Sequence, residues 1–384
     1  MPSPTVALKD VSTEDPLQQL IFAAVYAIAV TLMWRIGFSR VVPRLRASWP
    51  ALSISVLAMT SSLWSLAPQL TARRSIALLG TTLFGIYMGV RYSIPRFREM
   101  LFRVLAIIAS LSAVTAIFMP AYGVAGALGV APGWRGLFLD KNIFGRLMAL
   151  GVVTALAGQI PKRKSIRILA VAFFGALLLL SDAKSGLVVL VGVGACAPLF
   201  ILARGRGSST ASLLVWSVLI VLGVAVVAFE NTQPVLNALG RDITLSGRTK
   251  LWVDVISMIR HRPLLGWGFG AFWRGWTGPS AIVWSNNLWL PPHSHSGLLD
   301  GFLDVGLVGM AIFCVSAVML LTRCVLYARG ATVGRILPGM LVIFTLLYNL
   351  TESVLIKQNS LFWVLYVFLI VSSSHAPKRL DDEP

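Results

Sequence analysis

Residues 291–309 read PPHSHSGLLDGFLDVGLVG and join a polar segment to an apolar one. This stretch holds two of the chain's four histidines, His293 and His295. Asp300 and Asp304 follow inside the apolar part, four residues apart, on one face of a helix. Ionisable side chains at membrane depth are costly, and they therefore point to a functional site. The stretch predicts a histidine held at the watery mouth of a cavity in a membrane protein.

The composition of the whole chain supports this setting. Of its 384 residues, 57% are hydrophobic and only 12% are charged, whereas a soluble protein has roughly 25% charged residues. Apolar runs of about 17–20 residues, the length that crosses a bilayer as a helix, recur along the sequence. We expect an all-α polytopic membrane protein, because helices satisfy their own backbone hydrogen bonds in lipid.

The apolar runs predict eleven transmembrane helices in a single membrane domain, residues 17–374. Residues 1–16 form a polar N-terminal segment, and residues 375–384 are expected to form a cytoplasmic tail. The predicted spans are residues 17–34, 50–66, 75–90, 104–120, 143–160, 166–181, 185–203, 211–229, 297–321, 336–351 and 358–374.

The basic residues predict an orientation for these spans. Alternate connections, such as residues 35–46, 91–103 and 162–167, are rich in Lys and Arg, and connections of this kind face the cytoplasm. With eleven spans, the N-terminus and the long segment 230–296 then lie on the outer side. The same connections explain most of the net charge of +18, so no nucleic-acid partner is expected.

The long outer segment, residues 230–296, has a pattern of its own. A helix capped by Thr249 is predicted to run to about Arg260, with Leu251 and Val255 on its apolar face. A helix of this kind beside a bilayer is expected to lie in the membrane interface. The segment also holds six of the twelve tryptophans. Two roles are considered for them, an aromatic belt at the membrane interface and stacking on sugar rings. The six are Trp252, Trp267, Trp273, Trp276, Trp284 and Trp289.

Several cations are predicted to lie on the outer side, where the orientation rule does not explain them. The planar guanidinium of arginine suits the oxygen atoms of phosphate. We predict a site for a lipid diphosphate at the membrane surface, with snorkelling to lipid headgroups as the alternative. The residues concerned are Arg135, Lys141, Arg241, Arg248 and Lys250.

The histidines of the opening stretch are the best candidates for chemistry. His293 and His295 could bind a metal, but zinc needs three or four ligands and no cysteine lies near them in the sequence. We therefore expect neither a metal nor a cofactor, and interpret the pair as supplying a general base near neutral pH. Asp300, Asp304 and Glu352 are expected to orient or balance the cations, or to form a proton path.

Three stretches resemble the signatures of the O-antigen ligase and polymerase superfamily. WRGLFLDKNIFGRLMAL, residues 134–150, looks like its RGxFxHKNxxG motif, and residues 246–273, SGRTKLWVDVISMIRHRPLLGWGFGAFW, are similar to GRxxxW…hPxxGxGxxxF. HSHSGLLDGFLDVGLVGM, residues 293–310, resembles HxHNxYLdxxldxGlxG. The resemblance covers most of the chain from about Leu63 and is nearest to the exopolysaccharide production proteins that act as polymerases.

This resemblance implies a membrane glycosyltransferase of the C type, with a long outward loop between the eighth and ninth spans. Such enzymes transfer a glycan from undecaprenyl diphosphate to an acceptor hydroxyl at the periplasmic face of the bacterial inner membrane. The motifs place Arg135, Lys141 and Asn142 in the first stretch, Arg241, Arg248 and Trp252 in the second, and His293 and His295 in the third. The chain departs from the pattern at Asp140, where many members have His, and at Ser296, where many have Asn.

The resulting hypothesis is a metal-independent, inverting enzyme that polymerises lipid-linked repeat units of an exopolysaccharide. Its expected partners are the lipid-linked donor, the glycan acceptor and membrane lipids, with other exopolysaccharide assembly proteins as further candidates. A ligase that transfers polymer to lipid A core is the alternative within the family, and a polysaccharide or ion transporter is the alternative of another class. The catalytic residues are expected to be His295, Arg248 and Arg135, and the substrate-binding residues Lys141, Asn142, Arg241, Trp252, His293, Asp300 and Glu352.

Overall fold

The computed structural model describes residues 16–126, 132–202, 217, 248–287, 289–328 and 333–374. Helices dominate this part of the chain, as the apolar periodicity predicts. The described strands are the two-residue β1 (Val124–Ala125) and β2 (Gly133–Trp134), which pair antiparallel. A helix overlaps each predicted span except residues 211–229, of which the structure describes Ser217 alone.

By the contacts among its residues, the chain divides into two compact units. Each unit combines segments that are distant in sequence, and the prediction of one domain over residues 17–374 stays a prediction. The first unit comprises Met1–Arg91, Leu219–Met319 and Asn349–Ser374, and the second comprises Tyr92–Val218, Leu320–Tyr348 and His375–Pro384.

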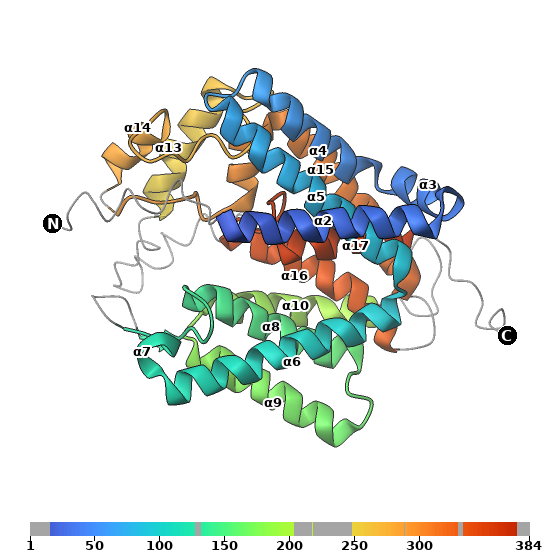
Figure 1. Ribbon diagram of the computed structural model, residues 1–384. Coiled ribbons are helices and arrows are strands. Elements are labelled where there is room, and N and C mark those ends of the chain that lie inside the picture. The colour runs from blue at the N-terminus through green and yellow to red at the C-terminus, as the bar shows by residue number, and fades with distance from the viewer. Residues whose placement is uncertain are drawn as a thin grey trace. The chain divides into compact units, whose positions relative to one another are not determined.

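Helix α5 is the centre of the first unit's helical layer (Figure 1) and packs against α2, α4 and α17. Gly85 in α5 lies so close to α17 that a Cβ there would come 2.8 Å from the Cβ of Val367. Small residues of this kind let membrane helices approach closely. The helices of this layer are α2 (Pro16–Ile36), α3 (Phe38–Ala47), α4 (Trp49–Thr60), η1 (Ser61–Leu63), α5 (Pro68–Arg91) and α17 (Leu361–Ser373).

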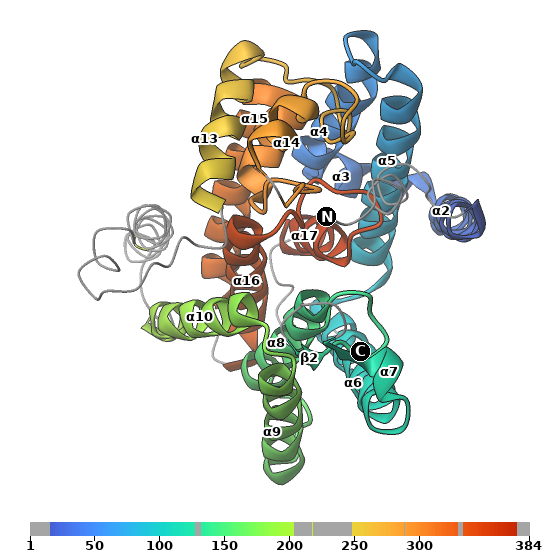
Figure 2. The ribbon, with the colours of Figure 1, turned by 90° about the vertical axis from the view of Figure 1, so that its left-hand side faces the viewer.

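The long loop contributes α13 (Arg248–His261) and α14 (Ser280–Asn286), which lie beside the first part of α15 (Gly297–Ala328) (Figure 2). Leu251 and Val255, on the apolar face of α13, are fully buried. They pack against partners from the loop and from α15 rather than facing a bilayer, so the prediction of an interfacial helix is wrong for this face. Side chains from the loop and from α15 cover this apolar face instead. The small core consists of Leu251, Val255, Met258, Phe272, Val283 and Leu303.

Four of the loop's six tryptophans donate indole hydrogen bonds that connect segments of the same region. The indole N–H of Trp252 donates to the carbonyl of Ser294 at 2.8 Å, and that of Trp284 donates to the carbonyl of Pro291 at 2.8 Å. Trp267 and Trp273 donate in the same way to the Met258 carbonyl and to Asp300. Buried indoles usually find such partners. Exposed indole area is found instead at Trp276 and Trp289, which are 54% and 43% exposed.

Helix α15 breaks at Gly306, where φ is 62° and ψ is −167°, although the sequence predicts a continuous span over residues 297–321. The loop re-satisfies the backbone groups that the break frees. Leu307 and Val308 donate their N–H groups to the carbonyls of Pro263 and Leu264 at 2.8 and 3.1 Å. Irregular backbone in a membrane protein is tolerated where protein covers it in this way. Asp300 and Asp304 therefore lie on a short helical segment rather than within one long span.

Two glycines face each other at this break. Gly266 and Gly306 both adopt positive φ, at 69° and 62°. A Cβ on Gly266 would come 2.6 Å from the Leu303 carbonyl oxygen, and one on Gly306 would collide with the backbone of Leu264. Only glycine accepts both the backbone angle and the close approach. The GWGFG and DVGLVG stretches of the sequence are therefore two halves of one packing unit.

Helix α8 (Lys141–Gly158) is the centre of the second unit and packs against α6, α9 and α10. Asp140 caps its N-terminus by accepting the backbone N–H of Asn142 at 2.6 Å, as Asp commonly does at this position. The other elements are α6 (Ile94–Phe118), α7 (Pro120–Gly123), α9 (Lys164–Leu180), α10 (Lys184–Leu202), η2 (Val333–Ile336) and α16 (Leu337–Thr351).

Five helical stretches among the described residues are long and apolar enough to cross a bilayer. Two shorter apolar helices, Trp49–Leu63 and Leu361–Ser373, accompany them. The chain is therefore a multi-pass membrane protein, while the count of eleven spans stays a prediction. The five stretches are Pro16–Ile36, Ile94–Phe118, Lys184–Ile201, Gly297–Ala328 and Gly334–Thr351.

Candidate active site

The two histidines lie in a tight turn before α15, which we call the His turn (residues 293–297). Its second residue, Ser294, is fully buried; its hydroxyl donates to the Ser296 carbonyl at 2.7 Å and accepts the Ser296 N–H at 3.1 Å. His295 adopts a left-handed backbone with φ of 54°, which is uncommon for any residue but glycine. Strained conformations of this kind persist where the surroundings fix them, often at functional sites.

Asp300 ties the His turn to two other segments. One carboxylate oxygen accepts the indole N–H of Trp273 at 2.9 Å and the backbone N–H of Ser294 at 3.2 Å. The other oxygen accepts the hydroxyl of Ser353. The side chain is 8% exposed, and a buried carboxylate needs such donors. This geometry suits an orienting role for Asp300, one of the roles that its place in the sequence suggests.

Glu352 faces the imidazole of His295. The Nδ1 atom of His295 lies 3.3 Å from Oε1 of Glu352, while its Nε2 atom is buried and makes no hydrogen bond with any described residue. A proton on Nδ1 can be donated to the carboxylate, which leaves the lone pair of Nε2 available. Paired carboxylate and imidazole groups of this kind work as general bases elsewhere, with the carboxylate stabilising the imidazolium that forms.

The ring of His293 is held in the opposite tautomer. Its Nδ1 accepts the backbone N–H of His295 at 3.1 Å, so a neutral ring carries its proton on Nε2, which lies 3.8 Å from Oε2 of Glu352. Burial, followed by the like charge of His295, lowers the pKa of His293 to about 4, despite the attraction of Asp300 and Glu352. His293 is therefore neutral at pH 7.

Glu352 remains ionised in this partly buried setting. Burial by itself would raise the pKa of its carboxyl group. The hydrogen bond from His295, and the attraction of Arg248 and of the two histidines in their protonated forms, outweigh burial and hold the pKa below its usual value. A charged carboxylate is thus present at neutral pH to orient His295.

Arg248, the first residue of α13, joins the same cluster. Its guanidinium donates to the Thr351 carbonyl at 3.1 Å and to Oε1 of Glu352 at 3.4 Å. Among the described residues, these two contacts use two of the five N–H donors of the group, which leaves the others for a ligand. One turn further along α13, Trp252 holds the Ser294 carbonyl. The structure thus brings Arg248, Trp252 and Glu352 together with both histidines, as the sequence predicts.

The same cluster has the spacing of a metal site, since ligand atoms of His293, His295 and Glu352 lie within 4.8 Å of one another. Two His and one Glu form the ligand set of some catalytic zinc sites. Two contacts do not fit this use. The His293 nitrogen that faces Glu352 carries the ring's proton, and the Arg248 guanidinium lies beside the carboxylate. We therefore derive no step through a metal, and expect turnover to persist in excess chelator.

The residues of the first motif lie in the second unit. Arg135 donates from Nε to the Tyr122 carbonyl at 2.7 Å, and Nζ of Lys141 lies 3.0 Å from Asp182. The Lys141 hydrogen bond and charge lower the pKa of Asp182. Asn142 lies in the first turn of α8. Their convergence with the His turn stays a prediction, and Arg241 lies outside the described residues.

The structure adds residues that the sequence did not single out for this site. Trp289 lies with its ring centroid 5.5 Å from that of His295 and is 43% exposed. Ser353 reaches Asp300 from the residue after Glu352. Proximity to His295 and Glu352 along the chain was the available signal for both, but it does not tell which side chain turns toward the site.

Comparisons with known proteins agree with the motifs. Residues 168–314 match the model of a family described as O-antigen ligase, and this range includes α13 and the His turn. A 189-residue stretch is 26% identical to the exopolysaccharide production protein ExoQ of Rhizobium meliloti (strain 1021). That alignment covers 46% of this chain and 43% of the relative, so the chain is matched to less than half of that protein's length.

Proposed function

We propose, from the match of residues 168–314 to the O-antigen ligase family, that this chain polymerises lipid-linked repeat units of an exopolysaccharide. The observation that carries the proposal is the pairing of His295 with Glu352, which leaves a buried Nε2 atom ready to accept a proton. The similarity to a protein named for exopolysaccharide production favours polymerisation over ligation.

The proposed reaction is a direct displacement at a sugar. Nε2 of His295 accepts the proton of the acceptor hydroxyl, and the oxygen of that hydroxyl forms a bond to the anomeric carbon of the donor. The bond from that carbon to the diphosphate oxygen breaks, and undecaprenyl diphosphate leaves with the bonding electron pair. A single displacement inverts the anomeric configuration, and it requires no nucleophile from the protein.

The cations are proposed to bind the diphosphate. Donors held in place before reaction stabilise negative charge as it develops on a leaving group. The N–H groups of Arg248 beyond its two described contacts are available for this. Arg135 is proposed to share the role, and Lys141, Asn142 and Arg241 to contact the donor. Their motif positions support these assignments.

The experiment that tests the proposal is turnover by purified protein in detergent. A synthetic undecaprenyl-diphosphate-linked repeat unit is supplied alone, and the products are separated by length. We expect a ladder of elongated chains without any ion gradient. A protein that moves the oligosaccharide across vesicles but never elongates it would be a transporter, and the polymerase proposal would be wrong.

A deletion strain separates polymerase from ligase. Loss of a polymerase leaves single repeat units on lipid, whereas loss of a ligase leaves full-length polymer that is not attached to lipid A core. We expect single repeats to accumulate. Free full-length polymer in the deletion strain would assign the ligase activity instead.

We also propose that the site faces the periplasm, across the bacterial inner membrane. Ile282 in α14 is 54% exposed and suits a cysteine probe; the exposed Cys314 is first replaced by alanine. Ile282→Cys should react with an impermeant thiol reagent in intact spheroplasts, while Arg163→Cys should react only after lysis. The opposite pattern would reverse the orientation.

A further inference from the structure

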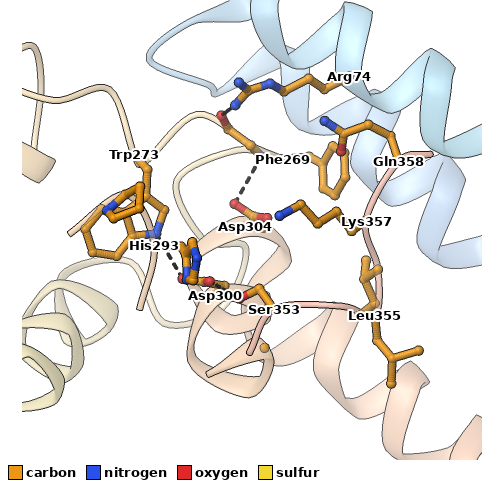
Figure 3. Close-up of a pocket in the computed structure, with 15 residues that line it drawn as sticks. Arg74, Phe269, Trp273, His293, Asp300, Asp304, Ser353, Leu355, Lys357 and Gln358 are labelled. Carbon is orange, nitrogen blue, oxygen red and sulfur yellow. Dashed lines mark hydrogen bonds between the residues drawn. The ribbon is translucent and has the colours of Figure 1, made fainter. Parts of the chain in front are cut away.

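A cavity of about 210 Å³ lies in the first unit and is lined by His293 (Figure 3), whose ring centroid lies 4.0 Å from that of His295. It is smaller than the roughly 300–1,000 Å³ of pockets for drug-sized ligands, so it suits one small ring rather than an oligosaccharide. The Glu352–His295 pair does not line it, and the reaction steps described above do not use it. Its wall includes His293, Trp273, Asp304, Lys357 and Gln358.

The cavity presents both hydrogen-bond donors and acceptors. Asp304 is partly exposed within it, and one of its carboxylate oxygens accepts the Gly270 N–H at 3.0 Å. The side chain of Lys357 extends toward Asp304 in Figure 3, and Gln358 lies next to it. Lys357 is exposed and Gln358 half-buried, which places this donor pair where the cavity meets solvent.

Apolar or aromatic side chains form other parts of the wall, namely Phe269, Trp273, Pro292 and Leu355, and the polar Arg74, Asp300 and Ser353 also line it. Small-molecule sites commonly combine such walls with a few placed polar groups. A pyranose ring matches this combination, because its C–H groups form apolar faces and its hydroxyls both donate and accept hydrogen bonds. Carboxylate, amide and ammonium groups at one rim can each contact a different hydroxyl.

The position of His293 links the cavity to the proposed chemistry. Its ring lines the cavity, and its centroid lies 4.0 Å from that of His295. A sugar in the cavity would therefore contact the imidazole that lies beside the proposed base. An acceptor needs a neighbouring position of this kind, since one of its hydroxyls must reach His295 while the rest of the ring is held.

We propose that this cavity binds the terminal sugar of the acceptor glycan, with Lys357, Gln358 and Asp304 selecting its hydroxyl pattern. The inference rests on the proposed glycosyl transfer and names where one of the two substrates binds. It assigns acceptor recognition to the 353–358 connection and the 269–273 loop, which are brought together at the His turn.

The test uses purified full-length protein with a lipid-free repeat-unit oligosaccharide as acceptor and saturating lipid-linked donor. Lys357→Met and Gln358→Ala should each raise the acceptor KM about tenfold, the loss expected for one hydrogen bond involving a charged group or a tightly placed amide. Both should keep kcat at saturating acceptor, and the donor KM, within about threefold. Lys164→Met, which removes an exposed lysine at the start of α9 outside the cavity, is the matched control and should change nothing.

A binding measurement separates failure of this inference from failure of the proposed function. Quenching of tryptophan fluorescence by the lipid-free acceptor is recorded without donor, and should be weakened in Lys357→Met but kept in Lys164→Met. Wild-type protein that binds the acceptor but transfers nothing would overturn the proposed function alone. Unchanged acceptor KM and binding in both cavity variants, or a change confined to the donor KM, would overturn the acceptor cavity.

Discussion

The His turn of the first unit and the Lys141–Asp182 pair of the second unit both hold ionisable residues predicted for one active site, yet they are built differently. At the His turn, the side chains of Arg248, Glu352 and His295 are only 12–19% exposed. In the second cluster, Lys141 is 14% exposed but its partner Asp182 is 49% exposed. At the His turn, Glu352 contacts both Arg248 and His295, whereas Lys141 and Asp182 form a pair at a connection between helices.

This difference shows which cluster suits chemistry and which suits docking. Charges removed from water interact strongly and need fixed partners, so a buried network holds one geometry. An exposed ion pair is screened and weak, so it can exchange one partner for a ligand at little cost. We therefore expect variants of the His turn to change the rate most, and variants of the exposed pair to change donor affinity modestly.

The largest effect is expected for His295→Asn. Asparagine tolerates positive φ better than most residues, so the turn should survive while the base is lost. General-base catalysis contributes about 10²–10⁴-fold, and turnover of the lipid-linked donor should fall by that factor. Thermal unfolding in detergent should stay within a few degrees of wild type.

The exposed His261 at the end of α13 provides the matched control for this experiment. His261→Asn removes an imidazole outside the cluster and should leave turnover unchanged. If His295→Asn keeps turnover within a few-fold of wild type, His295 is not the base. The His turn and the Lys141–Asp182 pair would then both act through substrate binding, and neither would supply the base.

Glu352→Gln should have the next largest effect. Glutamine keeps the shape of the side chain but not the charge that stabilises the His295 imidazolium. Hydrogen bonds to charged groups are worth about 1.5–3 kcal/mol, so kcat should fall about 10–150-fold. Glu99→Gln on α6 removes a partly exposed carboxylate that pairs with Arg96 and Arg103, and should leave kcat unchanged. Equal losses in both variants would contradict a specific role for Glu352.

The sequence predicted the helices of this fold well, because apolar runs of spanning length have few other solutions in a membrane. It did not predict the break at Gly306. The sequence there is apolar and continuous, and the break depends on the carbonyls of Pro263 and Leu264, some forty residues away. Long-range backbone contacts of this kind leave only indirect signs in a sequence, here the paired glycines Gly266 and Gly306.

The site was predicted in part for a related reason. The types and motif positions of His295, Arg248 and Trp252 indicated function, and the structure brings them together. The tautomer of His293 and the engagement of Asp300 by Trp273 depend on which donors reach them through the fold. The same holds for the cavity, since the sequence around Lys357 does not show that this side chain lies beside Asp304 and His293.

A smaller effect is expected in the stability of the His turn at mildly acidic pH. The pKa of His293 is lowered to about 4 in the folded protein, whereas a free histidine titrates near ~6.5. Between these values the unfolded chain binds the additional proton, so stability falls as the pH drops from 6.5 toward 4. The lowered pKa of Glu352 acts in the same direction, but only below about 4.3.

The window from pH 6.5 to 5 lies above the titration of Glu352, and the contribution of His293 is read there as the difference in slope between wild type and His293→Gln. This contribution to the Tm in detergent should be on the order of 1–3 °C per pH unit. His293→Gln should flatten this slope, and His261→Gln should keep it. A wild-type slope in His293→Gln would mean that His293 is not held neutral by its surroundings.

The smallest effect is expected for Asp182→Asn, which sharpens the comparison from the second unit. Asp182 has a φ of 50°, which asparagine accepts, so the turn should be preserved. The pair with Lys141 at 3.0 Å is partly exposed and is worth about 0–1 kcal/mol. If Lys141 exchanges this carboxylate for the donor's diphosphate, removing the competing charge should lower the donor KM, by less than about fivefold. The difference from wild type should shrink at high salt, because screening weakens the native pair.

An unchanged donor KM, or one that rises together with a loss of thermal stability, would show that the pair is structural and that Lys141 does not bind the donor.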